Sequence, residues 1–202
     1  MARPVVRVTA TDVAPMRAVW VSAFDEDAAQ SFARDISAIR QARQPILPLV
    51  IVSAGGEVYS LLAMLDALAT YDGTVVTIAL GQAMSCGAVL FSCGAQGHRY
   101  ISPNATLLLH DVSGPPVGGK ADEQQVNASE STRLNDLLWR RLSTNIGKPP
   151  WHLRALHGKR KSVDWYMTAR EAVRVGLASR VGLPVVEIRQ RLDPLLSTGS
   201  ER

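Results

Sequence analysis

Residues 74–88 read Thr74-Val75-Val76-Thr77-Ile78-Ala79-Leu80, followed by Gly81-Gln82-Ala83-Met84-Ser85-Cys86-Gly87-Ala88. The first run is apolar and rich in β-branched residues, which predicts a strand, and the small residues at 88–93 predict a helix. Ser85 therefore lies at a strand-to-helix turn, beside backbone N–H groups that a helix start leaves unpaired. Such a serine can act as a nucleophile with oxyanion donors nearby. It can also cap the helix, and position alone favours the cap.

The rest of the chain alternates short apolar runs with stretches of helical periodicity, a pattern typical of an α/β fold. We expect strands at 18–21, 46–52, 74–80, 99–101 and 106–109, and helices at 26–42, 58–68, 88–93, 122–145 and 169–175. The first half of the helix at 122–145 is almost entirely polar, so we expect it to project from the body. We divide the chain into a short N-terminal segment at 1–17, one domain at 18–183, and a polar, frayed tail at 184–202.

The composition limits the class of protein. A chain of 202 residues with 47% hydrophobic residues fits one domain with a substantial core. The sequence contains no apolar run of about 18 residues and no secretion signal, so we expect a cytoplasmic protein without a membrane partner. Cys86 and Cys93 would lie about 10 Å apart on one helix, which is too far for a disulfide. We expect no metal site, because no cysteines and histidines have zinc-ligand spacing.

The net charge of +4 and the isoelectric point near 9.4 are compatible with nucleic-acid binding. However, the densest basic stretch, at 154–161, lacks the interleaved aromatic side chains that stack on bases. A solvated surface loop explains this stretch better, and we expect no nucleic-acid partner.

Two further polar residues have positions that suit catalysis. His110 ends the apolar run Leu107-Leu108-Leu109, so its imidazole is expected at the rim of a buried strand, where a general base is useful. A structural histidine is the alternative. A histidine base needs an acid that fixes its orientation. Asp111 is adjacent, but neighbouring strand residues face opposite sides, so Asp164 is the better candidate, with an ordinary turn aspartate as the alternative.

Gly55-Gly56 follows the apolar strand expected at 46–52. Adjacent glycines let a backbone approach a ligand closely and expose an N–H group. The backbone N–H groups of Gly56 and Cys86 would then form an oxyanion hole beside Ser85. A pair of glycines is a weak signal by itself, since any turn can use it.

The order of these motifs along the chain is more specific than any one of them. Gly55-Gly56 is followed by the motif at 81–88, then by Pro103-Asn104 and the run at 107–110, and finally by Asp164 with Met167-Thr168-Ala169-Arg170-Glu171-Ala172 and Gly176-Leu177. This arrangement resembles the ClpP family of self-compartmentalised serine peptidases over residues 18–181.

The resemblance implies a serine endopeptidase that hydrolyses peptide bonds through an acyl-enzyme. Ser85 would be the nucleophile, His110 the general base and Asp164 its orienting partner. The oxyanion donors would be the N–H groups of Gly56 and Cys86. The chain itself would need no cofactor, since ATP in this family is used by a separate chaperone.

The resemblance also implies a crotonase-like fold of stacked ββα units with a protruding handle helix, here at about 111–146. Gly114, Gly118 and Gly119 would align a peptide substrate as an added strand. The partners would be other copies of the chain, in two stacked rings of seven that form a tetradecamer, together with peptide or unfolded protein and an AAA+ unfoldase.

The chain departs from the family at several positions. Trp165 follows Asp164, where the family has arginine or asparagine, and the arginine form makes a polar link across the rings. The segment 48–52 lacks the tyrosines that line the chaperone-docking pockets. Two alternatives share the fold: a non-catalytic ring scaffold or regulatory subunit, and a phage capsid-maturation protease. A Ser–Lys signal-peptide peptidase or an acyl-CoA-binding crotonase would leave His110 and Asp164 unexplained.

Overall fold

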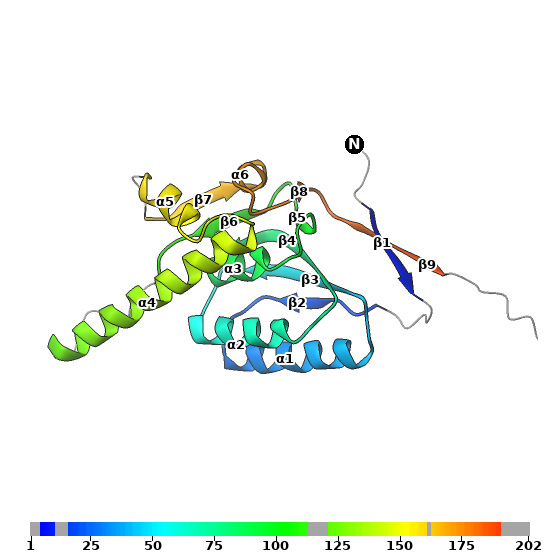
Figure 1. Ribbon diagram of the computed structural model, residues 1–202, viewed down its shortest axis with the longest axis horizontal. Helices are drawn as coiled ribbons and strands as arrows, with labels where there is room; N and C mark the ends of the chain where they lie inside the picture. The colour runs from blue at the N-terminus through cyan, green and yellow to red at the C-terminus, as the bar shows by residue number, and fades with distance from the viewer. Residues whose placement is uncertain (1–4, 11–15, 113–120, 161–162, 191–202) are drawn as a thin grey trace, which may run out of the picture.

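A computed structural model describes residues 5–10, 16–112, 121–160 and 163–190, and has the expected mixed α/β fold (Figure 1). Its elements in chain order are β1 (Val5–Ala10), β2 (Val19–Val21), α1 (Glu26–Gln41), β3 (Ile46–Ser53), α2 (Val58–Ala69), β4 (Thr74–Met84), α3 (Cys86–Ser92), β5 (Arg99–Ile101), β6 (Thr106–Leu109), α4 (Ala121–Asn145), α5 (His152–Gly158), β7 (Trp165–Thr168), α6 (Ala169–Val175), β8 (Arg180–Val181) and β9 (Val185–Gln190).

The main sheet of the described residues has seven strands and is almost entirely parallel. The strands β2, β3, β4, β5 and β8 lie in that order and run parallel. β6 pairs in parallel with the end of β4, and β7 pairs antiparallel with β6. A parallel sheet must be covered on both faces, which agrees with the continuous apolar runs that predicted the central strands.

The strand β4 changes its neighbour part-way along its length. Its first half pairs with β5 through Thr77 to Ala79, and its last residues, Gln82 to Met84, pair with β6. Gly81 lies between the two halves with a φ of +61°, a conformation that glycine adopts at low cost. We expected the strand to end at 80, and this was wrong because pairing with β6 continues it. Ser85 therefore emerges beside the end of β6.

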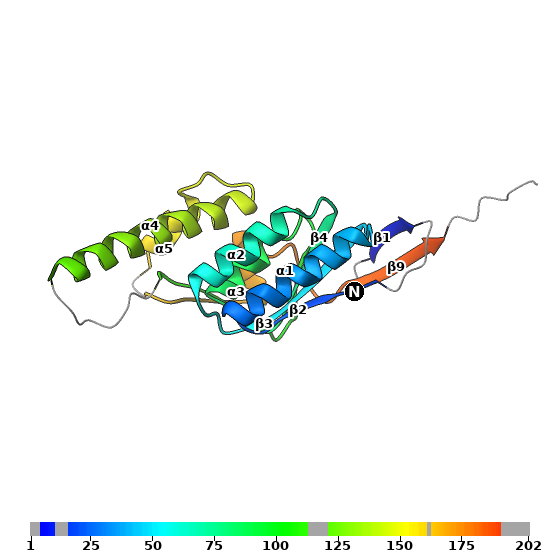
Figure 2. The same cartoon turned by 90° about the horizontal axis from the view of Figure 1, so that it is seen from below.

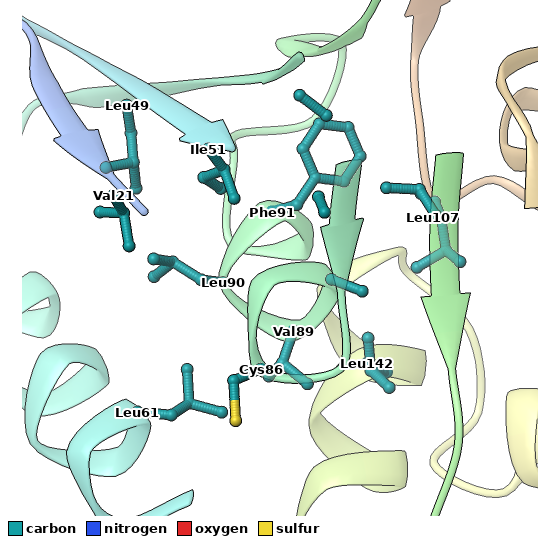
Figure 3. Packing of buried hydrophobic residues seen from close by; sticks show 14 of the residues in the cluster. Val21, Leu49, Ile51, Leu61, Cys86, Val89, Leu90, Phe91, Leu107 and Leu142 are labelled. Carbon is teal, nitrogen blue, oxygen red and sulfur yellow. The ribbon is translucent and has the colours of Figure 1, made fainter. Parts of the chain in front are cut away.

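The helices α1 and α2 lie side by side along the sheet (Figures 1 and 2). α1 buries Phe32, Ile36 and Ile39, the apolar stripe that predicted it. α3 begins at Cys86, two residues earlier than expected, and every residue from Cys86 to Ser92 is buried. Figure 3 shows its side chains between those of β3, such as Ile51, and those of β6 and α4. The helix that follows Ser85 is thus fixed by the core.

The helix α4 has a solvated half and a packed half. Residues 122–129 are exposed, and this end extends away from the body in both views (Figures 1 and 2). Farther along, Leu134, Leu138 and Leu142 are buried, at the four-residue spacing of one helix face. The prediction of a projecting helix is confirmed.

A buried arginine joins the ends of three helices to the sheet. Arg99 on β5 is 5% exposed, and its guanidinium donates to the carbonyl groups of Gly94, Asn145, Gly176 and Leu177 at 2.8–3.3 Å. These carbonyls follow or end α3, α4 and α6, where helix dipoles are negative. Burial lowers the pKa of the guanidinium from its ordinary value. The carbonyl groups replace the water that the charge loses.

Other parts of the chain also differ from the sequence expectation. The segment 165–168, for which no strand was expected, is β7, and it leads directly into α6. The capping box of Thr168 and Glu171 is present, and α6 ends at Gly176 with φ +91°. The tail after 184 was expected to be frayed, which is wrong for β9, because Val185 to Gln190 pair in parallel with Val5 to Ala10. Both runs are rich in β-branched residues, which favour such pairing.

Candidate active site

Ser85 lies at the junction of β4 and α3 in a strained backbone conformation. Its φ is +52° and its ψ is −118°, and among the described residues other than glycine only Ser85 and Arg43 have a positive φ. Such a conformation costs on the order of 1–3 kcal/mol. Ser85 is at the N-cap position, but its side chain makes no capping hydrogen bond. The capping role that position alone favoured is therefore not observed.

Backbone hydrogen bonds hold the Ser85 turn from both sides. The N–H group of Ser85 donates to the carbonyl of Leu108 on β6 at 2.9 Å. Its carbonyl accepts from Ala88 at 3.0 Å and from Val89 at 3.2 Å, inside α3. The turn is thus tied to the strand that carries His110 and to the buried helix.

The Gly55-Gly56 loop passes directly against Ser85. A Cβ atom on Gly55, whose φ is +107°, would lie 2.8 Å from the Cβ of Ser85 and 3.3 Å from its Oγ. A Cβ atom on Gly56 would lie 2.4 Å from the carbonyl oxygen of Phe24, with which Gly56 forms an isolated bridge. Both positions therefore require glycine, and the structure gives the pair a reason that the sequence alone could not.

A cleft of about 210 Å³ opens beside Ser85. Ser85, His110, Gly56 and Cys86 all line it, so the structure brings together four of the residues selected from the sequence. The remaining wall is mainly apolar and comes from α3, α4 and the chain beyond β6. Its residues include Val89, Leu109, Val112, Leu138, Trp139 and Leu142.

Asp164 is positioned by the antiparallel pairing of β6 with β7. Leu108 pairs with Tyr166, and Leu109 pairs with Trp165. Continuing this register by one residue puts Asp164 opposite His110. Asp164 is exposed, and it is not among the residues that line the cleft. The register of this strand pairing therefore relates two residues that are 54 positions apart in the sequence.

Asp111, the other candidate partner of His110, is engaged elsewhere. Its Oδ1 accepts a hydrogen bond of 2.7 Å from the indole N–H of Trp139 and forms an ion pair with Arg154. Partial burial acts to raise the pKa of Asp111, but these hydrogen bonds and nearby positive charges hold it below its ordinary value. The backbone N–H of Val112 donates to Asn135 at 2.7 Å. Asp111 therefore anchors the chain after His110 to α4 and α5.

The remaining predictions from the sequence concern the substrate-aligning glycines, metal ligands, membrane helices and the two cysteines. Gly114, Gly118 and Gly119 lie outside the described residues. Within the described residues, no group of three or more histidine, cysteine, aspartate or glutamate side chains is arranged to hold a metal ion, and no helix is long and apolar enough to cross a membrane. Cys86 and Cys93 are both free thiols, as expected from their spacing.

A comparison with known protein families agrees with the fold and the motif order. Residues 15–184 match the model of the family described as Clp protease. The chain belongs to the Clp protease family. The match includes Ser85, His110, Asp164 and both glycines, and it confirms the resemblance inferred from the sequence. Membership in the Clp protease family makes this a protein of the serine peptidase class.

One departure from the expected Clp protease pattern has a structural explanation here. Trp165 is 5% exposed and packs in the main core. The guanidinium of Arg160 lies 5.0 Å from the centre of its ring. A buried indole beneath an arginine cannot supply the polar link that the family resemblance attributes to an arginine at this position.

Sequence reasoning missed the apolar wall of this Clp protease cleft. Leu138, Trp139 and Leu142 come from the second half of α4, whereas the prediction from the sequence concerned only the polar first half of this helix and its projection from the body. A signal was present, because Leu134, Leu138 and Leu142 recur at the spacing of one helix face. Their proximity to Ser85 depends on how α4 packs against α3, which no local pattern contains.

Proposed function

We propose that this Clp protease is an endopeptidase in which Ser85 attacks the scissile carbonyl. His110 accepts the Ser85 proton and then donates it to the leaving amine, and Asp164 orients and stabilises the imidazolium. The acyl group remains on Ser85 until water, activated by His110, hydrolyses the ester. The observation that carries the proposal is that Ser85, in a strained turn, lines one cleft with His110.

The surroundings of Ser85 support the nucleophile role. The residue is held in a conformation that a structural serine has no reason to adopt, and its hydroxyl is not used as a cap. Strained nucleophile turns expose the hydroxyl at the end of a strand and keep backbone donors nearby. Here those donors are the N–H groups of Gly56 and Cys86, and both residues line the cleft. Preorganised donors of this kind stabilise the oxyanion of the tetrahedral intermediate.

The assignment of Asp164 rests on the strand register and on the engagement of Asp111. The β6–β7 pairing has Leu109 opposite Trp165, and the same register continued by one residue supports Asp164 as the partner of His110. Asp111 points to Trp139 and Arg154, so it is not available to the imidazole. A chain order of serine, histidine and aspartate differs from those of other serine hydrolases, but the roles depend on geometry and not on order.

The cleft supports a preference for an apolar substrate side chain next to the cleaved bond. Val89, Leu138 and Leu142 line it together with the indole of Trp139. In such a pocket, one extra buried methylene group changes the free energy that discriminates between two substrates by about 1–3 kcal/mol. Peptides with leucine or methionine before the scissile bond should therefore be cleaved faster than those with aspartate or lysine.

We further propose that the chain works in a ring assembly of stacked heptamers that encloses the clefts. Clp proteases generally form self-assembled rings with an unfoldase partner. The exposed half of α4 supports such an assembly, since it extends from the body and carries Val126 at 67% exposure. In the assembly this half would pack against another ring, residues 114–119 would align the peptide, and an AAA+ unfoldase would deliver unfolded protein.

Active-site labelling tests the catalytic proposal. The purified full-length protein is incubated with a fluorophosphonate, and the adduct is located by peptide mass spectrometry. We expect one adduct per chain on Ser85, none in Ser85→Ala, and labelling slower by on the order of 10³-fold in His110→Ala. An assembled particle that is not labelled, or is labelled at another residue, would contradict the proposal.

Native mass spectrometry tests the assembly. We expect a mass of about fourteen chains at micromolar concentration, as in the stacked heptamers of the proposal. Val126→Asp should shift the mass toward single rings or smaller species, whereas Asn127→Asp, the same charge at the next exposed position, should have less effect. A monomer for the unmodified protein would exclude the ring.

A further inference from the structure

The side chain of Cys86 connects the two backbone segments that border Ser85. Cys86 is 2% exposed, and its thiol donates a hydrogen bond to the carbonyl of Gly56 at 3.3 Å. In Figure 3 its sulfur is directed out of α3 toward the side on which Leu61 of α2 lies. The bond joins α3 to the loop between β3 and α2, which are 30 residues apart in the sequence.

Gly56 lies in a part of the cleft lining where the residue types themselves restrain the backbone dihedral angles only weakly. Gly55 and Gly56 are consecutive residues with φ values of +107° and +153°, and glycine has more conformational freedom than any other residue. On one side, the N–H of Glu57 holds the loop to the carbonyl of Phe24 at 2.7 Å. On the other side, the hydrogen bond from Cys86 holds the Gly56 carbonyl itself.

We propose that Cys86 is a positioning residue whose S–H···O=C hydrogen bond to Gly56 sets the spacing of the two oxyanion donors. The bond connects the same two residues whose backbone N–H groups would hold the oxyanion. The thiol does not touch substrate and acts through Gly56. This inference rests on the proposed function, because it assumes that Gly56 and Cys86 bind the oxyanion.

The chemistry of the thiol fits a donor role. Burial raises the pKa of Cys86, although its hydrogen-bonding neighbours act in the opposite direction. The thiol therefore stays protonated at neutral pH and keeps the hydrogen that it donates. A thiol is a weak donor, so the effect is on geometry more than on stability. Catalytic groups need to be held within about 0.5 Å, which a loop of two glycines does not ensure without an anchor.

Steady-state kinetics on a short peptide substrate test the proposal. We expect Cys86→Ala to lower kcat by about 10- to 100-fold, with KM changed less than about twofold, since a misplaced donor weakens only the transition state. The affinity for a peptide aldehyde, whose hemiacetal carries an oxyanion, should fall by a similar factor. Cys86→Ser, which differs from alanine only by a donor hydroxyl, should recover most of the rate.

Matched variants separate positioning from packing. Cys93→Ala removes a second free thiol at the end of α3, which contacts the Val89 carbonyl at 3.5 Å, and it should leave kcat and aldehyde affinity unchanged. Cys86→Val fills the buried site without supplying a donor, so it should behave as Cys86→Ala does. Thermal melts of all variants identify any loss of folding.

The outcomes distinguish this inference from the proposed function. If the unmodified protein shows no Ser85-dependent hydrolysis, the proposed function and this inference both fail. If the unmodified protein is active but Cys86→Ala and Cys86→Val keep kcat and aldehyde affinity within twofold, only this inference is overturned. It is equally overturned if Cys86→Ser is as slow as Cys86→Val, because the donor would then not matter.

Discussion

Gly55→Ala should lower peptidase activity by on the order of 10²-fold while the protein remains folded. The new Cβ atom would lie 2.8 Å from the Ser85 Cβ, 3.2 Å from the Met84 carbonyl oxygen and 3.3 Å from the Ser85 Oγ. Contacts under 3.0 Å essentially never occur for real Cβ atoms, so either the loop or Ser85 must move. Two of the three nearest atoms belong to Ser85, and relief of the contact therefore displaces the nucleophile.

The size of the effect follows from the geometry. An alanine at φ +107° has backbone strain of about 1–3 kcal/mol, and overpacking adds about 1–3 kcal/mol. This sum, about 2–6 kcal/mol, overlaps only the lower end of the roughly 5–15 kcal/mol that keeps a domain folded, so we expect a folded protein whose melting temperature falls by about 10 °C. Restoring ordinary contact moves Ser85 by about 1 Å, which lowers the rate by on the order of 10²-fold.

Gly97→Ala is the matched control. Gly97 also has a positive φ, +84°, but its Cβ would have no neighbour within 4 Å. The control should lose stability through backbone strain alone and retain activity. Both variants are assayed for kcat/KM and for the rate of fluorophosphonate labelling at 25 °C, with circular dichroism to confirm folding. If folded Gly55→Ala hydrolyses peptide with a kcat/KM within threefold of that of Gly97→Ala, the assignment of Ser85 in this turn as the nucleophile is refuted.

Three further outcomes are expected. Asp164→Asn should lower kcat by up to about 10⁴-fold without unfolding the protein, and a rate within tenfold of the unmodified protein would remove Asp164 from the triad. Arg99→Met leaves four buried or half-buried carbonyl groups without the Arg99 donor and should reduce the free energy of unfolding, measured in urea, by about 3 kcal/mol or more. Asp111→Asn should destabilise the protein at pH 7. The folded pKa of Asp111 lies below its ordinary value of 3.8, so its contribution is present above that value and is lost as the pH falls through the folded pKa; a difference between the two proteins that does not shrink as the pH falls below 3.8 would contradict this.

Local sequence patterns predicted most of the elements that build the cleft. The apolar stripe of α1 and the runs that became β3, β5 and β6 fall where their periodicity indicated. The capping box of Thr168 and Glu171 is present because it depends only on residues three apart. These features depend on residues that are close to one another in the sequence.

The remaining features depend on contacts between distant segments. β4 continues past Gly81 because β6 supplies new backbone partners, and β9 exists because it pairs with β1 at the other end of the chain. The β6–β7 register, which relates Asp164 to His110 when it is continued by one residue, is not encoded by periodicity. From the sequence, Asp164 was selected because Asp111 would face the other side of its strand, and the family resemblance then implied its role.

In the cleft, too, some features follow from local sequence and others from contacts between segments that are distant in the sequence. Ser85 and the glycine pair could be selected from their own neighbourhoods, although each had a common structural alternative. The positive φ of Ser85 and the close approach of Gly55 are constraints on these residues, and both become visible only when the loops are assembled. The hydrogen bond from Cys86 to Gly56 likewise joins segments 30 residues apart.

The central claim is that Ser85 forms an acyl-enzyme in this cleft. Rapid-quench mass spectrometry with an activated peptide ester, with the acylated residue located by fragmentation, tests it most directly. We predict a stoichiometric acyl adduct on Ser85 within the first turnover and none in Ser85→Ala, with the Cys86 thiol unmodified in both. Turnover without an adduct on Ser85, or an acyl group on Cys86, would contradict the account.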